Sequence, residues 1–310
     1  MAERDILILL STHNGTDFLP DQLESLRAQS VADRIHLVVR DDGSTDPTPD
    51  LVEATDLAPV TAEVVRGENL GARDSFSALI CSASPAFRTI MLCDQDDVWM
   101  PDKAETAARA IADTQTPVLY CGRSVTTDSS LHPVGVTDDA PRPSFRNSLF
   151  QNIAPGHTMA FNQPLAALYR RTINPHAIMH DWWLYCLASG AGTVIFDSTP
   201  HAYYRLHSRN EIGYGATTAQ RFLRDAKRLF FEDRSSLTLQ AEALEEMIGP
   251  DLSAEDHAMV KAFLDQSSLA SRWSYLRRYP MTAQQRRPPW MSALLFLLGR
   301  YRAPRAPMVE

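Results

Sequence analysis

The sequence has 310 residues, of which 44% are apolar and 22% charged, and its formal net charge is −8. These values are ordinary for a soluble globular protein and exclude fibrous and disordered classes, and the acidic balance of most of the chain argues against general nucleic-acid binding. The length predicts about two domains. Four widely spaced cysteines without a CxxC pair indicate buried thiols in a reducing compartment and argue against a zinc site.

The first elements predicted along the chain form one strand–helix–strand unit. Residues 5–10 are a continuous apolar run with the length of a buried strand, and the polar and turn-forming residues 11–15 end it. Leucines recur at helical spacing over residues 19–29, and residues 35–39 predict a second strand. Such a unit is expected to be parallel and right-handed. No basic stretch with a long apolar segment precedes it, so we expect no secretory signal and a cytoplasmic protein.

The same alternation continues to residue 93. A strand is predicted at residues 61–65, a helix at residues 72–82 and a further apolar strand at residues 89–93. Alternating strands and helices predict an α/β fold with a doubly wound, mainly parallel sheet, whose ligand crevice lies at the carboxyl ends of the strands.

Three polar segments follow predicted strands, at residues 11–15, 41–46 and 94–97. Because the carboxyl ends of parallel strands meet at one edge of a sheet, we expect these segments to line one crevice. Neither GxGxxG after the first strand nor GxxxxGK[ST] anywhere is present, so the dinucleotide fingerprint and the P-loop are both missing. A metal ion, rather than a glycine-rich loop, would have to hold a phosphate here.

The third polar segment holds three acids, Asp94, Asp96 and Asp97, directly after a buried strand. Three neighbouring carboxylates repel one another and call for a cation, and hard oxygen ligands suit Mg²⁺ or Mn²⁺. The alternative is that these acids cap a helix begun by Pro101. Capping accounts for one acid, best for Asp97, and leaves the other two unexplained.

The middle of the chain has a weaker pattern. A strand is predicted at residues 118–121, and residues 126–147 are expected to be a long loop that serves as a lid or binds an acceptor. Strand character returns at residues 156–162, followed by a helix to about Arg171.

Asp181 lies in the first turn of a predicted helix, beside Trp182 and Trp183. An acid partly desolvated by two indoles has a raised pKa and suits a general base. The alternative is that Asp181 caps the helix and the tryptophans belong to the core. Further on, Arg205 and His207 share a face of an extended run and could together meet an anionic group.

The last third of the chain is predicted to be helical from about residue 217, including residues 237–248 and 260–269. From residue 270 onward there are eight arginines against the single acid Glu310, with aromatic residues between them. Such a basic amphipathic tail suits an anionic membrane surface, while a packed bundle with a solvated basic face is the alternative. The apolar run at residues 294–298 is too short to span a bilayer.

Several motifs occur together in one order. They are Ser-Thr-His-Asn-Gly at 11–15, Arg-Asp-Asp-Gly-Ser-Thr-Asp at 40–46, Asn-Leu-Gly at 69–71, Cys-Asp-Gln-Asp-Asp-Val-Trp at 93–99, Pro-Asp-Lys at 101–103, His-Asp-Trp-Trp at 180–183 and Tyr-Arg-Leu-His at 204–207. Jointly they resemble the family 2 glycosyltransferases of the GT-A fold, and within them the rhamnosyltransferase-like branch that builds bacterial surface polysaccharides. The resemblance covers roughly residues 5 to 213.

The resemblance implies a GT-A domain at residues 1–215, and the change to helical periodicity predicts a C-terminal helical region at residues 216–310, basic and amphipathic towards its end. It implies inverting transfer of a sugar, with rhamnose from dTDP-rhamnose as the leading donor, to a saccharide or lipid-linked acceptor. Mn²⁺ or Mg²⁺ would assist direct displacement of the nucleoside diphosphate, with an Asp as general base. The expected location is the cytoplasm. Peripheral attachment to the inner face of the plasma membrane is a further expectation, based on the basic C-terminal tail.

The resemblance also assigns residues by position. Those implied to bind the nucleotide sugar are Ser11, His13, Asp42, Asn69, Arg73, Asp94, Asp96 and Arg205. Asp42 would accept a hydrogen bond from the imide N–H of the base, and His13 stands where the family usually has tyrosine. Asp96 and His207 would hold the metal ion, and Asp181 matches the catalytic base.

Two other classes of protein remain open at this point. A metal-dependent nucleotidyltransferase would also place acids at strand ends, but we would expect a basic glycine-rich loop after its first strand, and this sequence has none. A non-catalytic nucleotide-sugar-binding protein would keep residues 11–15 and 41–46 but has no use for Asp181 beside its tryptophans.

Overall fold

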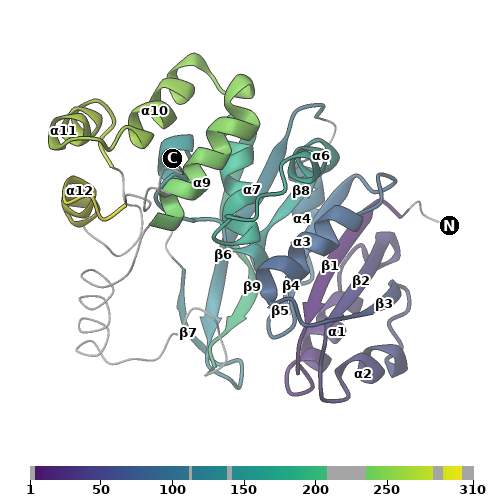
Figure 1. Ribbon diagram of the computed structural model, residues 1–310. Coiled ribbons are helices and arrows are strands. Elements are labelled where there is room, and N and C mark those ends of the chain that lie inside the picture. Colours follow the sequence, from purple (N-terminus) through teal and green to yellow (C-terminus); the bar gives the residue numbers. More distant parts are fainter. Residues whose placement is uncertain (1–3, 112–113, 138–141, 208–234, 282–288, 302–310) are drawn as a thin grey trace.

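The computed structural model describes residues 4–111, 114–137, 142–207, 235–281 and 289–301 (Figure 1). In this part of the chain the strands are β1 (Ile6–Thr12), β2 (Ile35–Asp42), β3 (Thr61–Gly67), β4 (Thr89–Asp94), β5 (Val98–Trp99), β6 (Val118–Thr127), β7 (Pro133–Val136), β8 (Ala160–Asn162) and β9 (Thr193–Arg205). The α-helices are α1 (Leu19–Arg27), α2 (Thr48–Ala54), α3 (Ala72–Ser82), α4 (Lys103–Ala110), α5 (Phe145–Ser148), α6 (Gln163–Arg171), α7 (His180–Ala191), α9 (Ser235–Ile248), α10 (Ala254–Leu264), α11 (Leu269–Arg278) and α12 (Pro289–Leu297). Short 3₁₀ turns occupy Ala32–Arg34, Gly156–Thr158 and Gly249–Asp251.

All these strands join one sheet, in the order β3-β2-β1-β4-β8-β6-β9-β5, with β7 paired to β6. β1 pairs in parallel with β2 and β4, β2 with β3, and β6 with β9. β8, β5 and β7 run antiparallel to their neighbours. The mainly parallel, doubly wound sheet expected from the sequence is confirmed, and the three antiparallel strands make it mixed.

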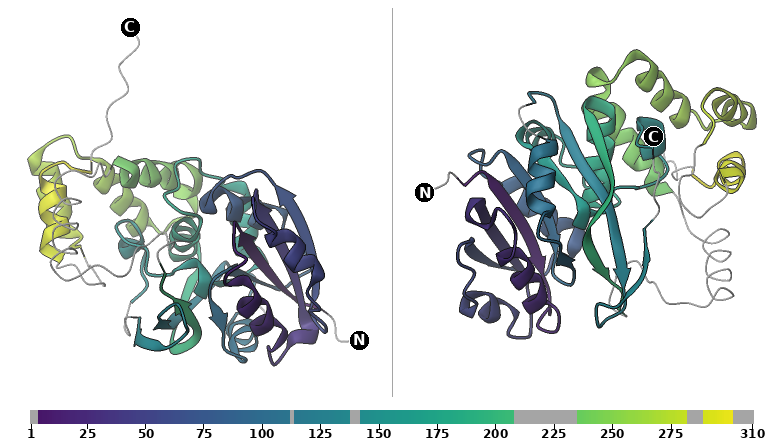
Figure 2. Two further views of the ribbon diagram at one scale, coloured as in Figure 1. Left: turned by 90° about the horizontal axis from the view of Figure 1, so that it is seen from below. Right: turned by 180° about the vertical axis from the view of Figure 1, so that it is seen from behind.

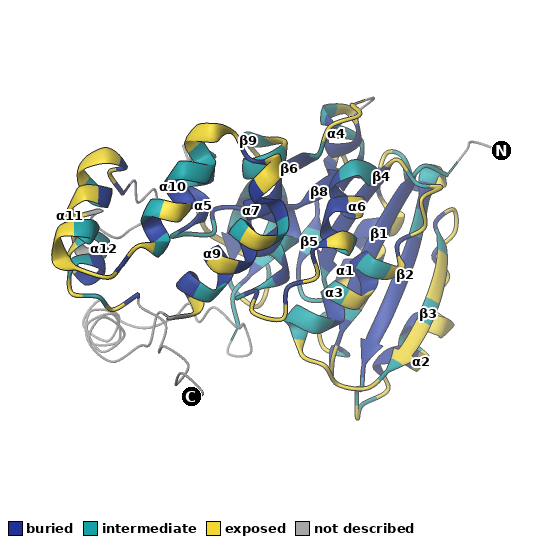
Figure 3. Cartoon of the chain, turned by 45° about the horizontal axis from the view of Figure 1, so that its top comes forward, coloured by how far each residue is buried: buried dark blue, intermediate teal, exposed yellow. Residues whose placement is uncertain are grey.

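Both faces of the sheet are covered, because alternate residues of β1 enter different cores. Leu7 and Leu9 pack in the larger core with Trp183 of α7, whereas Ile8 packs in the other core with Leu23 of α1. Figure 3 shows β1 and β2 buried along their lengths. Burial on both faces explains why the first strand is continuously apolar rather than alternating.

Residues 126–147 are not the long loop expected from the sequence. β6 continues to Thr127, β7 forms a hairpin with it, and α5 begins at Phe145. Val134 and Val136 of β7 are exposed, so this strand has no buried face to mark it in the sequence. The strand character expected at residues 156–162 resolves into a 3₁₀ turn and the short strand β8.

The C-terminal helices gather at the end of the molecule opposite β1, β2 and β3 (Figures 1 and 2). The single helix expected at residues 260–269 is wrong, because α10 ends at Leu264 and α11 begins at Leu269, where the Ser268 hydroxyl accepts the Ser271 N–H. The predicted domain boundary at residue 215 and the helix start near residue 217 lie outside the described residues. Among the described helices, none is long and apolar enough to cross a membrane.

Candidate functional site

The loops after β1, β2 and β4 meet, as expected from the sequence. The backbone N–H of His13 donates to Gln95 Oε1 at 2.9 Å, and the Gln95 amide donates back to the His13 carbonyl at 3.1 Å. The N–H of Asn14 donates to Ser44 Oγ at 2.9 Å, and Thr12 Oγ1 donates to Asp41 at 3.3 Å. Side chains from three strand ends are therefore fixed at one edge of the sheet.

Asp42, at the end of β2, is almost fully buried and is held by several donors. Its oxygens accept the N–H groups of Leu70 and Gly71, each at 2.9 Å, and the Arg40 guanidinium forms an ion pair with it. Gly71 has a φ of +78°, which favours glycine at this turn. Burial raises the pKa of Asp42, but these hydrogen bonds outweigh it, so the pKa is lowered overall.

The same network extends to the first strand. Arg40 Nη1 donates to Ser75 Oγ at 2.8 Å, and Ser75 Oγ lies 2.6 Å from Ser11 Oγ. Ser11 and Asp42, both predicted from the sequence to bind nucleotide, are thus joined through Arg40 and Ser75, which the sequence reasoning missed. Arg40 precedes the paired acids in the quoted motif, but a strand-end arginine gives no sign of where its guanidinium points.

The solvent-exposed part of this region is formed by His13 and Asn69. The His13 Nδ1 lies 3.0 Å from the Asp42 carbonyl oxygen, and the Asn69 amide nitrogen lies 3.3 Å from both His13 ring nitrogens. Asp42 is only 3% exposed, so an incoming ligand meets His13 and Asn69 first. Arg73, also predicted to bind the nucleotide sugar, has its guanidinium engaged within the protein. It pairs with Asp74 at 2.8 Å and donates to the Ala177 carbonyl at 3.2 Å.

Asp96 and His207, the two residues predicted to hold a metal ion, lie next to each other. His207 Nε2 is 2.7 Å from an Asp96 carboxylate oxygen, although the residues are far apart in sequence. The His207 ring stacks on Phe18 at 4.6 Å between ring centroids, and the Arg205 guanidinium lies 4.8 Å from the centre of the same ring. Arg205 also pairs with Asp21 at 2.7 Å. Arg205 and His207 therefore share a face, as the extended segment predicted.

Asp97 does not cap a helix, contrary to the expectation from the sequence. The N-cap of α4 is Asp102, and Pro101 lies one residue before that cap. Asp97 is fully buried, with one oxygen accepting the backbone N–H of Arg205 at 3.2 Å and the other without a hydrogen-bond partner in the described part of the chain. Burial, together with the charges of Asp96 and Asp94, raises its pKa well above the usual range.

A second group of potential ligands includes Asp97. Ligand atoms of Asp94, Asp97 and His157 all lie within 4.8 Å of one another. The buried Lys103 donates from Nζ to the His157 carbonyl, and its ammonium lies 4.1 Å from the centre of the Trp99 ring. Burial lowers the pKa of Lys103 to about 8, while the nearby acidic groups, Asp94 among them, oppose that shift.

Lys103 therefore supplies part of the positive charge that the clustered carboxylates require. Neither Lys103 nor His157 is among the site residues predicted from the sequence. Burial lowers the pKa of His157 to about 3, which favours the neutral imidazole. A lysine after Pro-Asp is typical of an exposed helix start, so its burial could not be read from the sequence.

Asp181 is held at the start of α7 by backbone donors. One oxygen accepts the Trp182 N–H at 2.6 Å, the other accepts the Gly156 N–H at 3.1 Å, and the Asn152 side chain bonds to it as well. Burial outweighs these bonds and raises the pKa of Asp181 to about 6. The N-cap residue of α7 is Met179 rather than Asp181, although Asp181 accepts the N–H of Trp182 in the first turn of the helix.

Both indoles beside Asp181 are anchored. Trp183 is fully buried and donates from Nε1 to the Thr172 carbonyl at 2.9 Å, and Trp182 donates from Nε1 to the Ser148 carbonyl at 2.6 Å. Trp183 belongs to the core, as expected from the sequence interpretation in which the tryptophans are core residues. Together they fix the helix start that carries the acid.

One 3₁₀ turn, Gly156–Thr158, connects the two groups of acids. Gly156 contacts Asp181 through its N–H, and the next residue, His157, has its Nδ1 3.9 Å from Asp97. A Cβ added at Gly156 would lie 3.1 Å from His180 Nε2, so this turn packs closely against the start of α7. Asp97 and Asp181, more than eighty residues apart in sequence, are therefore both brought next to a single turn.

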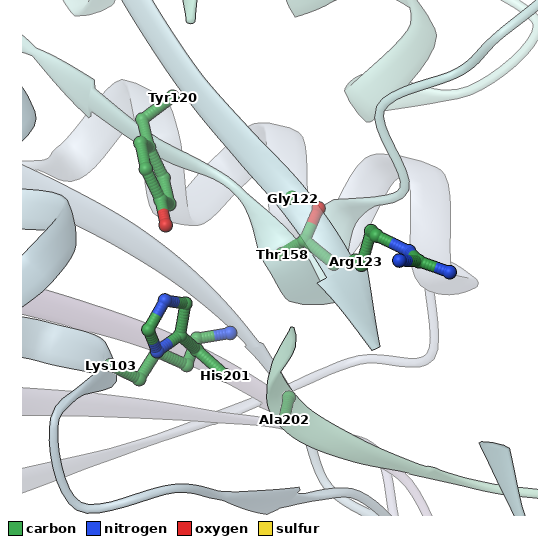
Figure 4. Close-up of a pocket in the computed structure, with 7 residues that line it drawn as sticks. All are labelled: Lys103, Tyr120, Gly122, Arg123, Thr158, His201 and Ala202. Carbon is green, nitrogen blue, oxygen red and sulfur yellow. The ribbon is translucent and has the colours of Figure 1, made fainter. Parts of the chain in front are cut away.

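A small pocket adjoins this region at Lys103 (Figure 4). It is lined by Lys103, Tyr120, Gly122, Arg123, Thr158, His201 and Ala202. The Tyr120 hydroxyl donates to Asp197 at 2.8 Å, and His201 lies between Asp197 and Asp102, at 3.2 and 3.1 Å. These polar groups satisfy one another, and none of the residues predicted to bind the nucleotide sugar lines the pocket.

Comparison with known proteins gives the family. Residues 7–176 match the model of glycosyl transferase family 2. The chain is 27% identical over 218 residues to dTDP-rhamnosyl transferase RfbG of Shigella flexneri, covering 66% of this chain and 73% of that protein. It is 26% identical over 221 residues to the putative glycosyltransferase EpsH of Bacillus subtilis, covering 65% of this chain and 61% of that one.

Solved structures agree on the fold. S. aureus TarS 1–349 in complex with UDP-GlcNAc superposes with a TM-score of 0.58 at 15% identity, covering 96% of this chain and 81% of that one. GalNAc-T7 with UDP, GalNAc and Mn²⁺ gives 0.54 at 11% identity, covering 90% and 59%. The chain has the GT-A fold and belongs to glycosyl transferase family 2.

Proposed function

We propose that this protein moves a sugar from a nucleotide diphosphate donor to an acceptor hydroxyl with inversion at the anomeric carbon. The observation that carries the proposal is the turn Gly156–Thr158, where the Gly156 N–H donates to Asp181 and the next residue, His157, has its Nδ1 3.9 Å from Asp97. An inverting transfer needs a proton acceptor and a site for the leaving diphosphate on opposite sides of one sugar ring.

In this reaction the acceptor oxygen attacks the anomeric carbon as its proton passes to a carboxylate oxygen of Asp181. The new C–O bond forms while the bond to the diphosphate oxygen breaks, and the nucleoside diphosphate leaves with the electron pair. A carboxylate with a pKa of about 6 is ionised at neutral pH and still basic enough to accept that proton. The hydrogen bonds from Gly156 and Trp182 keep it in one orientation.

We propose Asp96 and His207 as the residues that hold a divalent metal ion. Their ligand atoms are 2.7 Å apart, so both could reach one ion, and a carboxylate with an imidazole suits Mn²⁺ better than Mg²⁺. When bound, the ion would stabilise the negative charge that develops on the diphosphate, by several kcal/mol. The Mn²⁺ named with GalNAc-T7 supports this choice for a chain of the same fold.

We propose that the donor nucleotide lies along the loops after β1, β2 and β4. His13 and Asn69 would contact the base and Asp94 the ribose side, while Asp42, Arg40 and Ser11 hold the loops in place. Arg73 is left out of this set, because Asp74 and backbone carbonyls already engage its guanidinium. Arg205 remains a proposed contact of the diphosphate.

The leading donor is dTDP-rhamnose, and the acceptor is a saccharide or a lipid-linked saccharide of a surface polysaccharide. The similarity to RfbG, which is described as a dTDP-rhamnosyl transferase, supports this choice of sugar. An acceptor linked to a lipid would place the enzyme at the cytoplasmic face of the plasma membrane.

A thermal-shift panel tests the donor. Because a ligand that binds only the folded state raises its stability, by about 2.7 kcal/mol at a concentration of 100 Kd, we expect dTDP-rhamnose with Mn²⁺ to give the largest rise in Tm. UDP-GlcNAc and GDP-mannose serve as the matched comparison. A larger rise with either of them would overturn the choice of sugar, and no rise with any nucleotide sugar would overturn the proposal itself.

A second experiment tests the metal assignment. Asp96→Asn should lose most of its turnover and its response to Mn²⁺ while it remains folded, since Asp96 packs at the surface of the site rather than in the core. Release of nucleoside diphosphate is measured with and without acceptor, in Mn²⁺ and in chelator. Full activity of Asp96→Asn in chelator would remove the metal from the mechanism.

A further inference from the structure

Helices α11 and α12 form the outer layer of the molecule at the end opposite β1, β2 and β3 (Figures 1 and 2). The two helices pack against each other. Arg272 of α11 reaches the end of α12, where its Nη1 lies 2.6 Å from the position that a Cβ on Gly299 would occupy. The pair therefore acts as one surface element.

The inner sides of both helices belong to the core. Tyr275, Phe296 and Tyr301 are buried and pack with Phe150 and Phe263, with ring centroids 5.1 to 6.5 Å apart. The C-terminal region is thus a packed bundle, one of the two forms considered from the sequence. This packing buries some of its aromatic residues but leaves Trp273 and Trp290 exposed.

The outer sides of the helices carry a second set of large apolar side chains. On α11, Leu269 is 60% and Trp273 55% exposed, and from α12 onward Trp290 is 65%, Leu294 46% and Leu298 61% exposed. Within each helix these residues are four positions apart, so they share one face. Half of the large apolar side chains that are exposed in the described residues lie between Leu269 and Leu298, which is more than scattered surface residues require.

All the charged residues between Leu269 and Tyr301 are arginines. Arg277 and Arg278 are exposed and line one surface hollow with Trp273, and Arg300 is exposed two residues after Leu298. The sequence contains no acid between Asp265 and Glu310. Tryptophan and arginine together are typical of surfaces at the boundary between lipid headgroups and acyl chains, where the indole is half desolvated and the guanidinium meets phosphate.

We infer that this face, defined by Leu269, Trp273, Trp290, Leu294 and Leu298 with Arg277, Arg278 and Arg300, docks on a membrane that contains anionic lipid. A second copy of the chain is disfavoured as the occupant, because pairing two such faces would set the arginines of one copy against those of the other, with no acid in residues 266–309 to offset them. The proposed function supplies the reason for docking, since a lipid-linked acceptor lies at that surface.

Vesicle flotation of the full chain tests the inference. Vesicles of phosphatidylcholine alone are compared with vesicles in which phosphatidylglycerol replaces about a third of the lipid, where each arginine near the surface contributes about fivefold in affinity. We expect binding to the anionic vesicles only. Trp273→Ser combined with Trp290→Ser should lower the partition coefficient at least tenfold, and Arg277→Gln combined with Arg278→Gln should lower it by about tenfold or more.

The matched control is Val134→Ser combined with Val136→Ser, which removes two exposed apolar side chains from β7 and should leave flotation unchanged. Acceptor-independent release of nucleoside diphosphate is measured on the same variants, so that a defect in transfer and a defect in docking are told apart. The inference is overturned if the wild-type chain does not float, if it binds neutral and anionic vesicles equally, or if the tryptophan variant turns a dimer into a monomer without changing flotation.

Discussion

The pKa values of buried carboxylates are shifted in opposite directions at the two ends of the candidate site. At the end of β2, Asp42 accepts hydrogen bonds from Leu70, Gly71 and Arg40, and its pKa is lowered despite burial. Around the turn Gly156–Thr158, burial is the dominant influence, and it raises the pKa of both Asp97 and Asp181.

The difference shows that hydrogen-bond donors, rather than burial alone, decide what a buried acid can do. The β2 end is arranged to stay charged and fixed, as a binding surface requires. At the other end, burial shifts each of these groups towards its neutral form, and it also lowers the pKa of His157 and His180 to about 3. This second end is suited to proton transfer.

The largest expected effect comes from removing the proposed base. Asp181→Asn keeps the shape of the side chain but cannot accept the proton, so transfer should fall by about 10²- to 10⁴-fold. Donor affinity should stay near the wild-type value, because Asp181 does not belong to the loops proposed to bind the nucleotide. Steady-state transfer and donor titration measure the two quantities separately.

Asp197→Asn is the matched control for that variant. Asp197 is another partly buried acid, but it bonds Tyr120 and His201 and its pKa is lowered overall, since hydrogen bonds outweigh burial. Its transfer rate should stay within a few-fold of wild type. Equal losses in both variants would show that Asp181→Asn acts through the fold rather than through the proton.

The next effect is on stability at the opposite end of the site. Asp42→Asn leaves the buried Arg40 without its ion-pair partner, so the free energy of unfolding at neutral pH should fall by about 3–5 kcal/mol. Because the folded pKa of Asp42 is lowered, its contribution is present above the unfolded pKa of about 3.9 and is lost as the pH falls below it. Urea unfolding at several pH values measures this; an unchanged midpoint at neutral pH would contradict the account.

Asp181→Asn should have the opposite effect on stability. The folded pKa of about 6 lies above the unfolded value, so the wild type bears a cost for ionising Asp181 at neutral pH that the amide avoids. Asparagine has a single acceptor oxygen, so the hydrogen bond from either Gly156 or Trp182 is lost, and the variant should gain at most about 1–2 kcal/mol in free energy of unfolding. The gain should vanish below about pH 4, where Asp181 of the wild type is protonated in both the folded and the unfolded protein. A loss of stability at neutral pH would show that those hydrogen bonds dominate.

The smallest expected effect concerns Asn152, a positioning residue. Its side-chain hydrogen bond lowers the pKa of Asp181 and so opposes burial. Asn152→Ala should therefore raise the pKa of Asp181 further and move the midpoint of the pH–rate profile upward, with little change in donor affinity. A midpoint that stays in place would mean that Gly156 and Trp182 alone set the state of the acid.

Much of the sheet was predictable from the sequence, because buried parallel strands and their helices leave strong periodic signals. The helix at residues 72–82 matches α3 residue for residue, and the three polar loops meet as expected. β7 was missed because its side chains are exposed on both faces. The sequence does not distinguish a packed C-terminal bundle from a membrane-binding tail, because aromatic residues on one helix can face either the core or a membrane.

The candidate site was predictable as a set of acids and histidines, but its internal arrangement was not. The contact of His207 with Asp96 spans more than a hundred residues, and the buried state of Lys103 depends on Trp99 and His157 around it. The role given to Asp97 as a cap was wrong because the short strand β5 moves the helix start to Lys103. Such tertiary placement has no local signal in the sequence.

The central claim is that Asp181 is the group whose ionisation permits transfer. The most direct measurement is the transfer rate at saturating donor as a function of pH from about 5 to 8, with donor affinity measured in parallel. The account predicts a rate that rises with a single midpoint near pH 6 and then levels off, while donor affinity stays flat. A rate independent of pH over this range, or the same midpoint in Asp181→Asn, would contradict it.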